Sequence, residues 1–201
     1  SDIDFAGRTN VKTNVTMARL EGVGGTKTLK NIDLTFNEAG KGLIQDITTK
    51  LSDVRFENIT ISNNASGNNL GIIVQNNGDI SNLEFNQIEI NASKIKYVGC
   101  ISNNTGNISN VNLDDIQIHG SNYTGGFIGS TTETEISGIN INNFTISGYD
   151  YTGGLFGIIT GVDTSENIGN MTATEGNVSG HDCHFLLFAH PSREQKEEGC
   201  Q

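Results

Sequence analysis

The chain has 201 residues, of which 34% are hydrophobic and 6% aromatic, and its formal net charge is −11. A compact domain of this length normally carries more apolar residues, whereas a repetitive, elongated fold needs only a thin core along its axis. The acidic balance and the scattered Lys and Arg residues argue against nucleic acid as a partner, because binding to phosphates requires clustered cations. No run approaches the roughly 20 consecutive apolar residues of a membrane-spanning helix, so membrane insertion is not expected.

Residues 1–40 are expected to form an N-terminal cap. Residues 2–5 alternate polar and apolar side chains, as a half-buried strand does. Residues 17–25 predict a strand followed by a glycine turn, and residues 28–36 predict a first, irregular coil. Polar sequence begins at Ser1 without a secretory leader, so we expect the chain to be a piece of a longer protein.

Residues 41–180 repeat a set of three short phrases. The first phrase is clearest at Tyr123–Gly126 and Tyr151–Gly154, both of which read Tyr-Thr-Gly-Gly, and weaker copies start near residues 41, 69 and 96. The third phrase places an isoleucine at equivalent points of four units, namely Ile61, Ile90, Ile118 and Ile146. Their spacing is roughly 28 residues, within the range of stacked repeats.

The recurrence of whole phrases predicts an all-β fold, a parallel β-helix (β-solenoid) of about six coils, for which we expect a right-handed sense. Apolar residues alternate with polar ones within each phrase, which sends the apolar side chains to one face of each strand. The four isoleucines should therefore form one interior column. An antiparallel β-sandwich also has short strands at regular spacing, but it does not explain why whole phrases recur.

Small and polar residues mark the expected turns. The glycine pairs Gly125-Gly126 and Gly153-Gly154 should permit backbone turns that a β-branched residue resists. Asparagines at turns tolerate left-handed geometry and can bond to the next coil; those singled out are Asn63, Asn64, Asn76, Asn77, Asn103 and Asn104. Cys100 stands where other repeats have a small or apolar residue, so we expect it to be buried and structural.

The C-terminal region departs from the repeat. Residues 181–188 match residues 149–156 at an offset of about 32, and residues 181–190 are expected to form a partial capping coil. Residues 191–201 are charged and expected to be disordered or a short helix. His181, Cys183 and His184 are the weak candidates for metal ligands. The His-x-x-His spacing in a strand directs the two rings to opposite faces, so we expect no metal site and no cofactor.

The two Tyr-Thr-Gly-Gly phrases, each leading to an Ile-Ser-Gly or Val-Ser-Gly close, resemble the GLUG repeat. That repeat occurs in bacterial surface adhesins and in the β-helical regions of immunoglobulin A1-cleaving zinc metallopeptidases of Gram-positive pathogens. The resemblance covers about residues 2–180 and implies a β-helix in an extracellular or cell wall-anchored protein. The protease chemistry of that family resides in a separate domain with a His-Glu-x-x-His helix. That motif is absent from these 201 residues, so no catalytic residue is carried over.

Polysaccharide lyases and glycoside hydrolases also use parallel β-helices, and they form the enzymatic alternative. Glycoside hydrolysis needs two carboxylates roughly 5–10 Å apart across a cleft. Asp114 and Asp115 are the most suggestive pair, and stacking is expected to bring Glu57 and Gln87 close to Asp115. The inward positions of the repeats stay apolar and no aromatic platform for a sugar accompanies these acids, which favours a solvated polar face.

These observations predict a non-catalytic β-solenoid segment of a secreted or cell-surface bacterial protein. It would act as a stiff spacer or as a surface that binds a host glycoprotein or glycan, either in an adhesin or in the ectodomain of a zinc metallopeptidase. Adjacent domains of the parent chain would be its other partners.

Overall fold

The structure is a computed structural model in which residues 2–6, 8, 11–132, 134–160 and 168–184 are described. The described residues form sixteen β-strands and no helix. The strands are β1 (Ile3–Asp4), β2 (Val15–Glu21), β3 (Lys27–Phe36), β4 (Lys41–Asn63), β5 (Gly67–Asn76), β6 (Asp79–Asn91), β7 (Ile95–Val98), β8 (Ile101–Asn104), β9 (Ile108–His119), β10 (Thr124–Gly125), β11 (Ile128–Thr132), β12 (Ile136–Ser147), β13 (Thr152–Gly153), β14 (Phe156–Thr160), β15 (Ile168–Ser179) and β16 (Cys183–His184).

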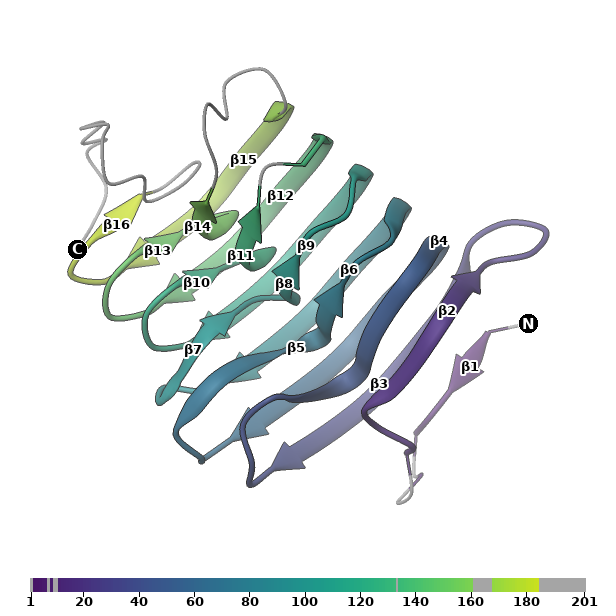
Figure 1. Cartoon of the computed structure of the whole chain (residues 1–201), viewed down its shortest axis with the longest axis horizontal. Coiled ribbons are helices and arrows are strands. Elements are labelled where there is room, and N and C mark those ends of the chain that lie inside the picture. Colours follow the sequence, from purple (N-terminus) through teal and green to yellow (C-terminus); the bar gives the residue numbers. More distant parts are fainter. Residues whose placement is uncertain (1, 7, 9–10, 133, 161–167, 185–201) are drawn as a thin grey trace.

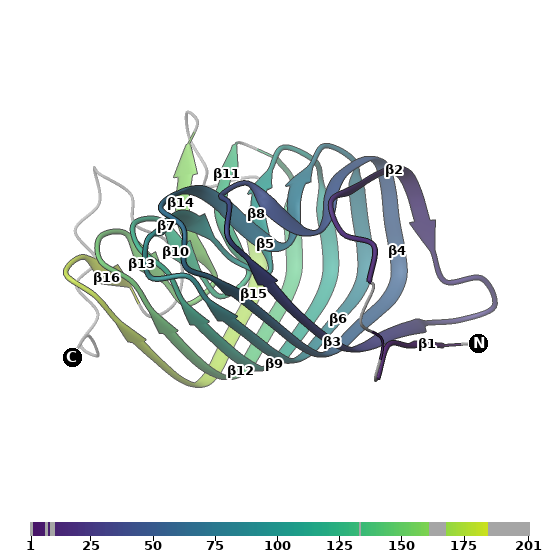
Figure 2. The ribbon, with the colours of Figure 1, turned by 90° about the horizontal axis from the view of Figure 1, so that it is seen from below.

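The strands stack in parallel to form a β-solenoid of about six coils with a spacing of about 28 residues. Figure 1 shows the long strands β4, β6, β9, β12 and β15 lying side by side from the N-terminal to the C-terminal end. Figure 2, seen from below, shows each coil closing around a common interior. Strands pair with their equivalents in adjacent coils, so residues at equivalent positions of the sequence repeat lie next to one another in the structure.

The corners of the coils are made by residues with left-handed backbone conformation. One corner column contains Asn82 (φ 54°), where the step between Ile80 and Leu83 predicts a bend. The three columns are Asp53, Asn82, Asn110, Gly138 and Asn170; then Asn31, Asn58, Gln87, Asp115, Asn143 and Glu175; and then Gly40, Asn69, Tyr97, Tyr123 and Tyr151. Asn and Asp dominate the first two columns because their short polar side chains tolerate this region.

The predicted interior column is confirmed. Ile61 pairs with Ile90, Ile90 with Ile118, and Ile118 with Ile146, and none of the four is more than 2% exposed. Leu34 and Val178 extend the column at its two ends. Apolar packing therefore runs through the whole stack.

The glycine pairs are required for a different reason from the predicted one. Gly125, Gly126, Gly153 and Gly154 do not have positive φ; the left-handed residue is the tyrosine two positions before each pair. A Cβ atom at Gly126 would lie 2.3 Å from the carbonyl oxygen of Gly154, and one at Gly153 would lie 2.0 Å from that of Phe156. Gly125, Gly126 and Gly153 are therefore needed because nearby backbone approaches too closely for any side chain.

The asparagines predicted to adopt left-handed turns are also corrected. Asn63, Asn64, Asn76, Asn77, Asn103 and Asn104 all lack positive φ. Three of them bond to the next coil as predicted. Buried Asn76 donates to Asn104 Oδ1 at 2.7 Å, and Asn104 donates to Thr131 Oγ1 at 3.0 Å. Asn77 Oδ1 accepts from Thr105 Oγ1 at 2.8 Å. The role of Asn76 and Asn104 is an interior polar ladder that satisfies buried amides.

Both ends of the repeat region continue the parallel register. At the N-terminal end, β3 pairs with β4 and β1 pairs with β3. At the C-terminal end, β16 pairs with β13, with Cys183 opposite Thr152 and His184 opposite Gly153. The offset is therefore 31 residues (183 − 152), one fewer than predicted. The remainder of the predicted capping coil, from residue 185 to 190, and the tail, 191–201, lie outside the described residues.

Candidate functional site

The broadest regular surface is the outward sheet face, defined as the outward side chains of the long parallel strands from β3 to β15. Along each strand these positions alternate with buried ones; in β9, for example, Val111 and Leu113 are buried while Asn112 and Asp114 are exposed. Equivalent side chains lie in columns because the strands are in register. One column contains Asn112, Asn140 and Thr172, and the next contains Asp114, Asn142 and Thr174.

Hydrogen bonds between coils fix these side chains in rows. Asn142 Nδ2 donates to Asp114 Oδ1 at 3.0 Å, and Thr174 Oγ1 donates to Asn142 Oδ1 at 2.8 Å. Such rows immobilise the side chains before any partner arrives, which reduces the entropy that binding would cost. The outward sheet face is therefore a pre-organised array of amides, hydroxyls and carboxylates.

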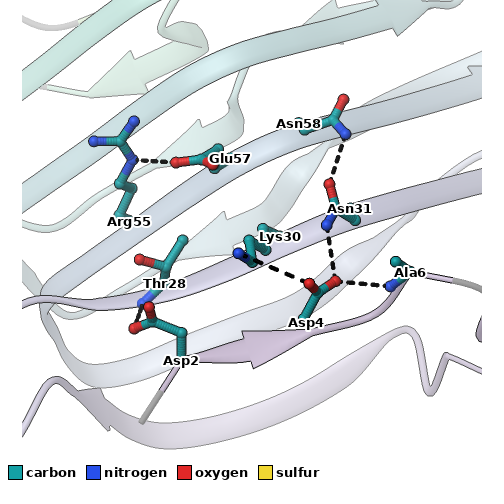
Figure 3. Close-up of polar contacts among 9 residues, drawn as sticks. All are labelled: Asp2, Asp4, Ala6, Thr28, Lys30, Asn31, Arg55, Glu57 and Asn58. Carbon is teal, nitrogen blue, oxygen red and sulfur yellow. Dashed lines mark hydrogen bonds and ion pairs between the residues drawn. The ribbon is translucent and has the colours of Figure 1, made fainter.

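Each of three polar rows begins at an aspartate on its N-terminal side. In the row shown in Figure 3, Asn58 donates to Asn31 Oδ1 at 2.7 Å and Asn31 donates to Asp4 Oδ1 at 2.8 Å. A carboxylate can only accept, so the first asparagine must present its NH₂ group, and its oxygen then faces the next coil. The other two rows are Asp53–Asn82–Asn110 and Asp46–Asn77–Thr105. In a further row Asp114 lies in the middle and accepts from both Asn86 and Asn142.

Cations are held near the N-terminal part of the outward sheet face. Arg55 Nε lies 2.7 Å from Glu57 Oε2, a contact that Figure 3 shows, and Arg55 Nη1 lies 3.1 Å from Glu84 Oε2. These partly exposed pairs contribute little to stability. Their effect is that the single guanidinium of Arg55 offsets part of the negative charge of Glu57 and Glu84.

The pair Asp114 and Asp115 sits at a corner between two strand segments. Asp114 is in register with Asn86 and Asn142, and it accepts hydrogen bonds from both of their side-chain amides. Of the expected neighbours of Asp115, Gln87 is confirmed, because it lines up with Asp115, whereas Glu57 lines up with Asn86 and Asp114, one position away. The side chains on both sides of Asp114 are therefore carboxamides, and neither is the second carboxylate that glycoside hydrolysis would need.

A row of stacked tyrosines was not predicted. The tyrosine ridge, formed by Tyr97, Tyr123 and Tyr151, occupies the third corner column, with ring centroids 4.7 Å and 5.0 Å apart and ring planes within 11°. All three have positive φ, which is unusual for a large side chain and is offset here by ring stacking. Burial, followed by the neighbouring Tyr97 and Tyr151, raises the pKa of the Tyr123 hydroxyl. The signal in the sequence was Tyr at equivalent points of three repeats.

A group of three polar side chains lies at the C-terminal end of the tyrosine ridge. His181 Nδ1 lies 3.3 Å from Asp150 Oδ1 and 3.7 Å from Asp182 Oδ1. His181 was a candidate ligand, and the structure brings it together with two aspartates that sequence reasoning missed. The other two candidates, Cys183 and His184, belong to β16 and pair with Thr152 and Gly153.

Cys100 is buried, as predicted. Its Sγ atom lies 3.3 Å from the carbonyl oxygen of Gly126, and burial raises the pKa of the thiol. A thiol that resists ionisation is neither a nucleophile nor a ready metal ligand. Cys100 therefore has a packing role.

Within the part of the chain that the structure describes, no helix is long and apolar enough to cross a membrane. Comparisons of the chain with protein-family models, with curated proteins and with solved structures find no match.

Proposed function

We propose that this chain is a non-catalytic β-solenoid segment of a secreted or cell-surface bacterial protein that binds a host glycoprotein or glycan through the outward sheet face. The observation that carries the proposal is the set of hydrogen-bonded polar rows on that face. Fixed amides and hydroxyls can exchange hydrogen bonds with a polar ligand without first being ordered. A continuous parallel stack also gives the stiffness that a spacer between a cell surface and its target requires.

The resemblance to the GLUG repeat supports the cellular setting. The two phrases that carry it occupy equivalent places in adjacent coils, with Thr124 opposite Thr152 and Gly125 opposite Gly153. Close backbone contacts require Gly125, Gly126 and Gly153 of these phrases. The geometry of the solenoid thus accounts for the repeat motif. The ligand would be bound by the outward side chains, which lie outside that motif.

Binding of the chain to immobilised immunoglobulin A1, mucin and a panel of glycans tests the proposal. The Asn112→Lys/Asn140→Lys variant changes two exposed, stacked positions on the outward sheet face. Its matched control, Asn103→Lys/Ser130→Lys, changes two stacked and half-exposed positions on β8 and β11. Binding should be weakened in the first variant and kept in the control. A ligand that binds both variants equally well does not use this face.

The non-catalytic part of the proposal has its own assay. Incubation of the chain with immunoglobulin A1, mucin and acidic polysaccharides should yield no cleavage product. Asp114 carries hydrogen bonds from Asn86 and Asn142, an arrangement that serves the polar rows. A product that disappears in the Asp114→Asn/Asp115→Asn variant would replace this proposal with a glycan-active enzyme.

A further inference from the structure

Three side chains of the types that bind metals converge at the C-terminal end of the tyrosine ridge. Asp150 precedes β13, and His181 and Asp182 precede β16 in the next coil. Because Thr152 is opposite Cys183, Asp150 is brought opposite His181, while Asp182 follows Tyr151 along the ridge. The two carboxylates and the imidazole offer ligand atoms that all lie within 4.8 Å of one another.

The backbone holds these three residues in place. The amide of His181 donates to the carbonyl oxygen of Tyr149 at 2.7 Å, and the amide of Thr152 donates to that of Asp182 at 2.9 Å. The His181 ring also stacks on Tyr149, with centroids 6.2 Å apart and planes within 17°. The three ligand atoms therefore come from two coils that the parallel ladder already fixes relative to each other.

Charge and orientation in this group favour a cation. Among the described residues, Asp150 and Asp182 form ion pairs with His181 alone, so two carboxylates face one imidazole. Asn122 Nδ2 donates to Asp150 Oδ2 at 3.2 Å, and Asp150 Oδ1 is the atom that faces His181. A hydrogen bond to the second oxygen of a carboxylate is the arrangement that orients metal ligands. The His181 side chain is 73% exposed, so an ion can reach it from solvent.

We propose that Asp150, His181 and Asp182 bind a divalent transition metal, for which Zn²⁺ is the best match. One imidazole nitrogen and two carboxylate oxygens are accepted zinc ligands, and three protein ligands leave a position for water. The ion would join the coil that contains β16 to the preceding coil. The site is separate from the outward sheet face, so it stands independently of the ligand proposed above.

Calorimetric titration of the metal-stripped chain with zinc chloride tests this proposal. We expect a saturable site for one ion. His181→Ala, Asp150→Asn and Asp182→Asn should each weaken binding by at least about tenfold, and Asn122→Ala should weaken it by about tenfold through the lost orientation of Asp150. His119→Ala and Asp33→Asn, which remove an exposed imidazole and an exposed carboxylate elsewhere on the solenoid, are the matched controls and should leave the affinity unchanged.

Thermal unfolding gives a second measurement. Zinc should raise the melting temperature of the wild type and of both controls, because an ion that binds only the folded state stabilises it. It should not do so in the three ligand variants. Absence of zinc binding in the wild type, or an affinity that survives in both Asp150→Asn and Asp182→Asn, would overturn the proposal, since the ion would then be absent or held elsewhere in the chain.

Discussion

Replacing Ile118 by alanine should lower the free energy of unfolding by about 3–5 kcal/mol. The side chain is 2% exposed and lies between Ile90 and Ile146 of the adjacent coils. Three carbon atoms leave the core, which costs about 2.4 kcal/mol at roughly 0.8 kcal/mol for each buried methylene. The cavity adds to this cost because ladder hydrogen bonds hold the coils on both sides and prevent them from closing the space.

Urea unfolding followed by far-ultraviolet circular dichroism measures this change. Gln117→Ala is the control, because Gln117 is the adjacent residue on the outward side and its replacement should change stability by no more than about 0.5 kcal/mol. Ile118→Asp should be more severe than Ile118→Ala, since an unpaired carboxylate would enter a thin core. If Ile118→Ala costs less than about 1 kcal/mol, or no more than Gln117→Ala, the argument that Ile118 is an irreplaceable part of a rigid column is refuted.

Three further outcomes follow from the corners and ends of the solenoid. Gly126→Ala should lower the free energy of unfolding by about 1–3 kcal/mol, because its Cβ would lie 2.3 Å from the Gly154 carbonyl oxygen. Gly169→Ala is the control: a Cβ there has no atom within 4 Å, so this variant should unfold at nearly the wild-type urea concentration. Tyr123→Ala should be about 1 kcal/mol less stable than Tyr123→Gly, because both lose the ring stack but only glycine relaxes at φ 61°; the reverse order would contradict the left-handed assignment. The pKa of Asp4 lies below its ordinary value, chiefly through the hydrogen bond from the Ala6 amide and then that from Asn31. The stabilisation of β1 by ionised Asp4 is therefore complete above about pH 4 and is lost as the pH falls through the lower folded-state pKa. The Ala6 amide signal in nuclear magnetic resonance should shift as the pH falls through that pKa in the wild type, but not in Asp4→Asn.

Most of the fold could be predicted because parallel, in-register stacking turns an alignment of repeats directly into a list of contacts. Once Ile90 and Ile118 are recognised as equivalent, their pairing follows without further information. The bend after Ile80 could be predicted for the same reason. The spacing of Ile80 and Leu83, one residue longer than strict alternation, recurs along the repeats.

The reasons for particular corner residues could not be predicted from composition. Glycine is associated with positive φ, yet in the Tyr-Thr-Gly-Gly phrases the tyrosine takes that conformation and the glycine avoids a collision with backbone. Only the distance from each glycine to nearby backbone, in the same coil or in the adjacent one, distinguishes these two needs.

The group formed by Asp150, His181 and Asp182 was missed because it depends on the register of the least regular repeat. The offset between Thr152 and Cys183 is 31 residues (183 − 152), against 28 between Thr124 and Thr152 (152 − 124). With an offset of 32, Asp150 would be matched to Asp182 and His181 to Tyr149. The error of one residue therefore misses the direct pairing of Asp150 with His181.

The aspartate at the N-terminal end of three polar rows has a consequence for how such a chain can lengthen. A coil copied from the middle of such a row carries asparagine or threonine there, both of which donate and accept, so duplication of that coil leaves every bond intact. A coil that begins a row, such as the one with Asp53, cannot be duplicated so freely, because the two copies would bring two carboxylates together. Gene duplication should therefore favour coils that carry only asparagine or threonine in these rows, such as the coil of β12 with Asn140 and Asn142, over coils that carry an aspartate there.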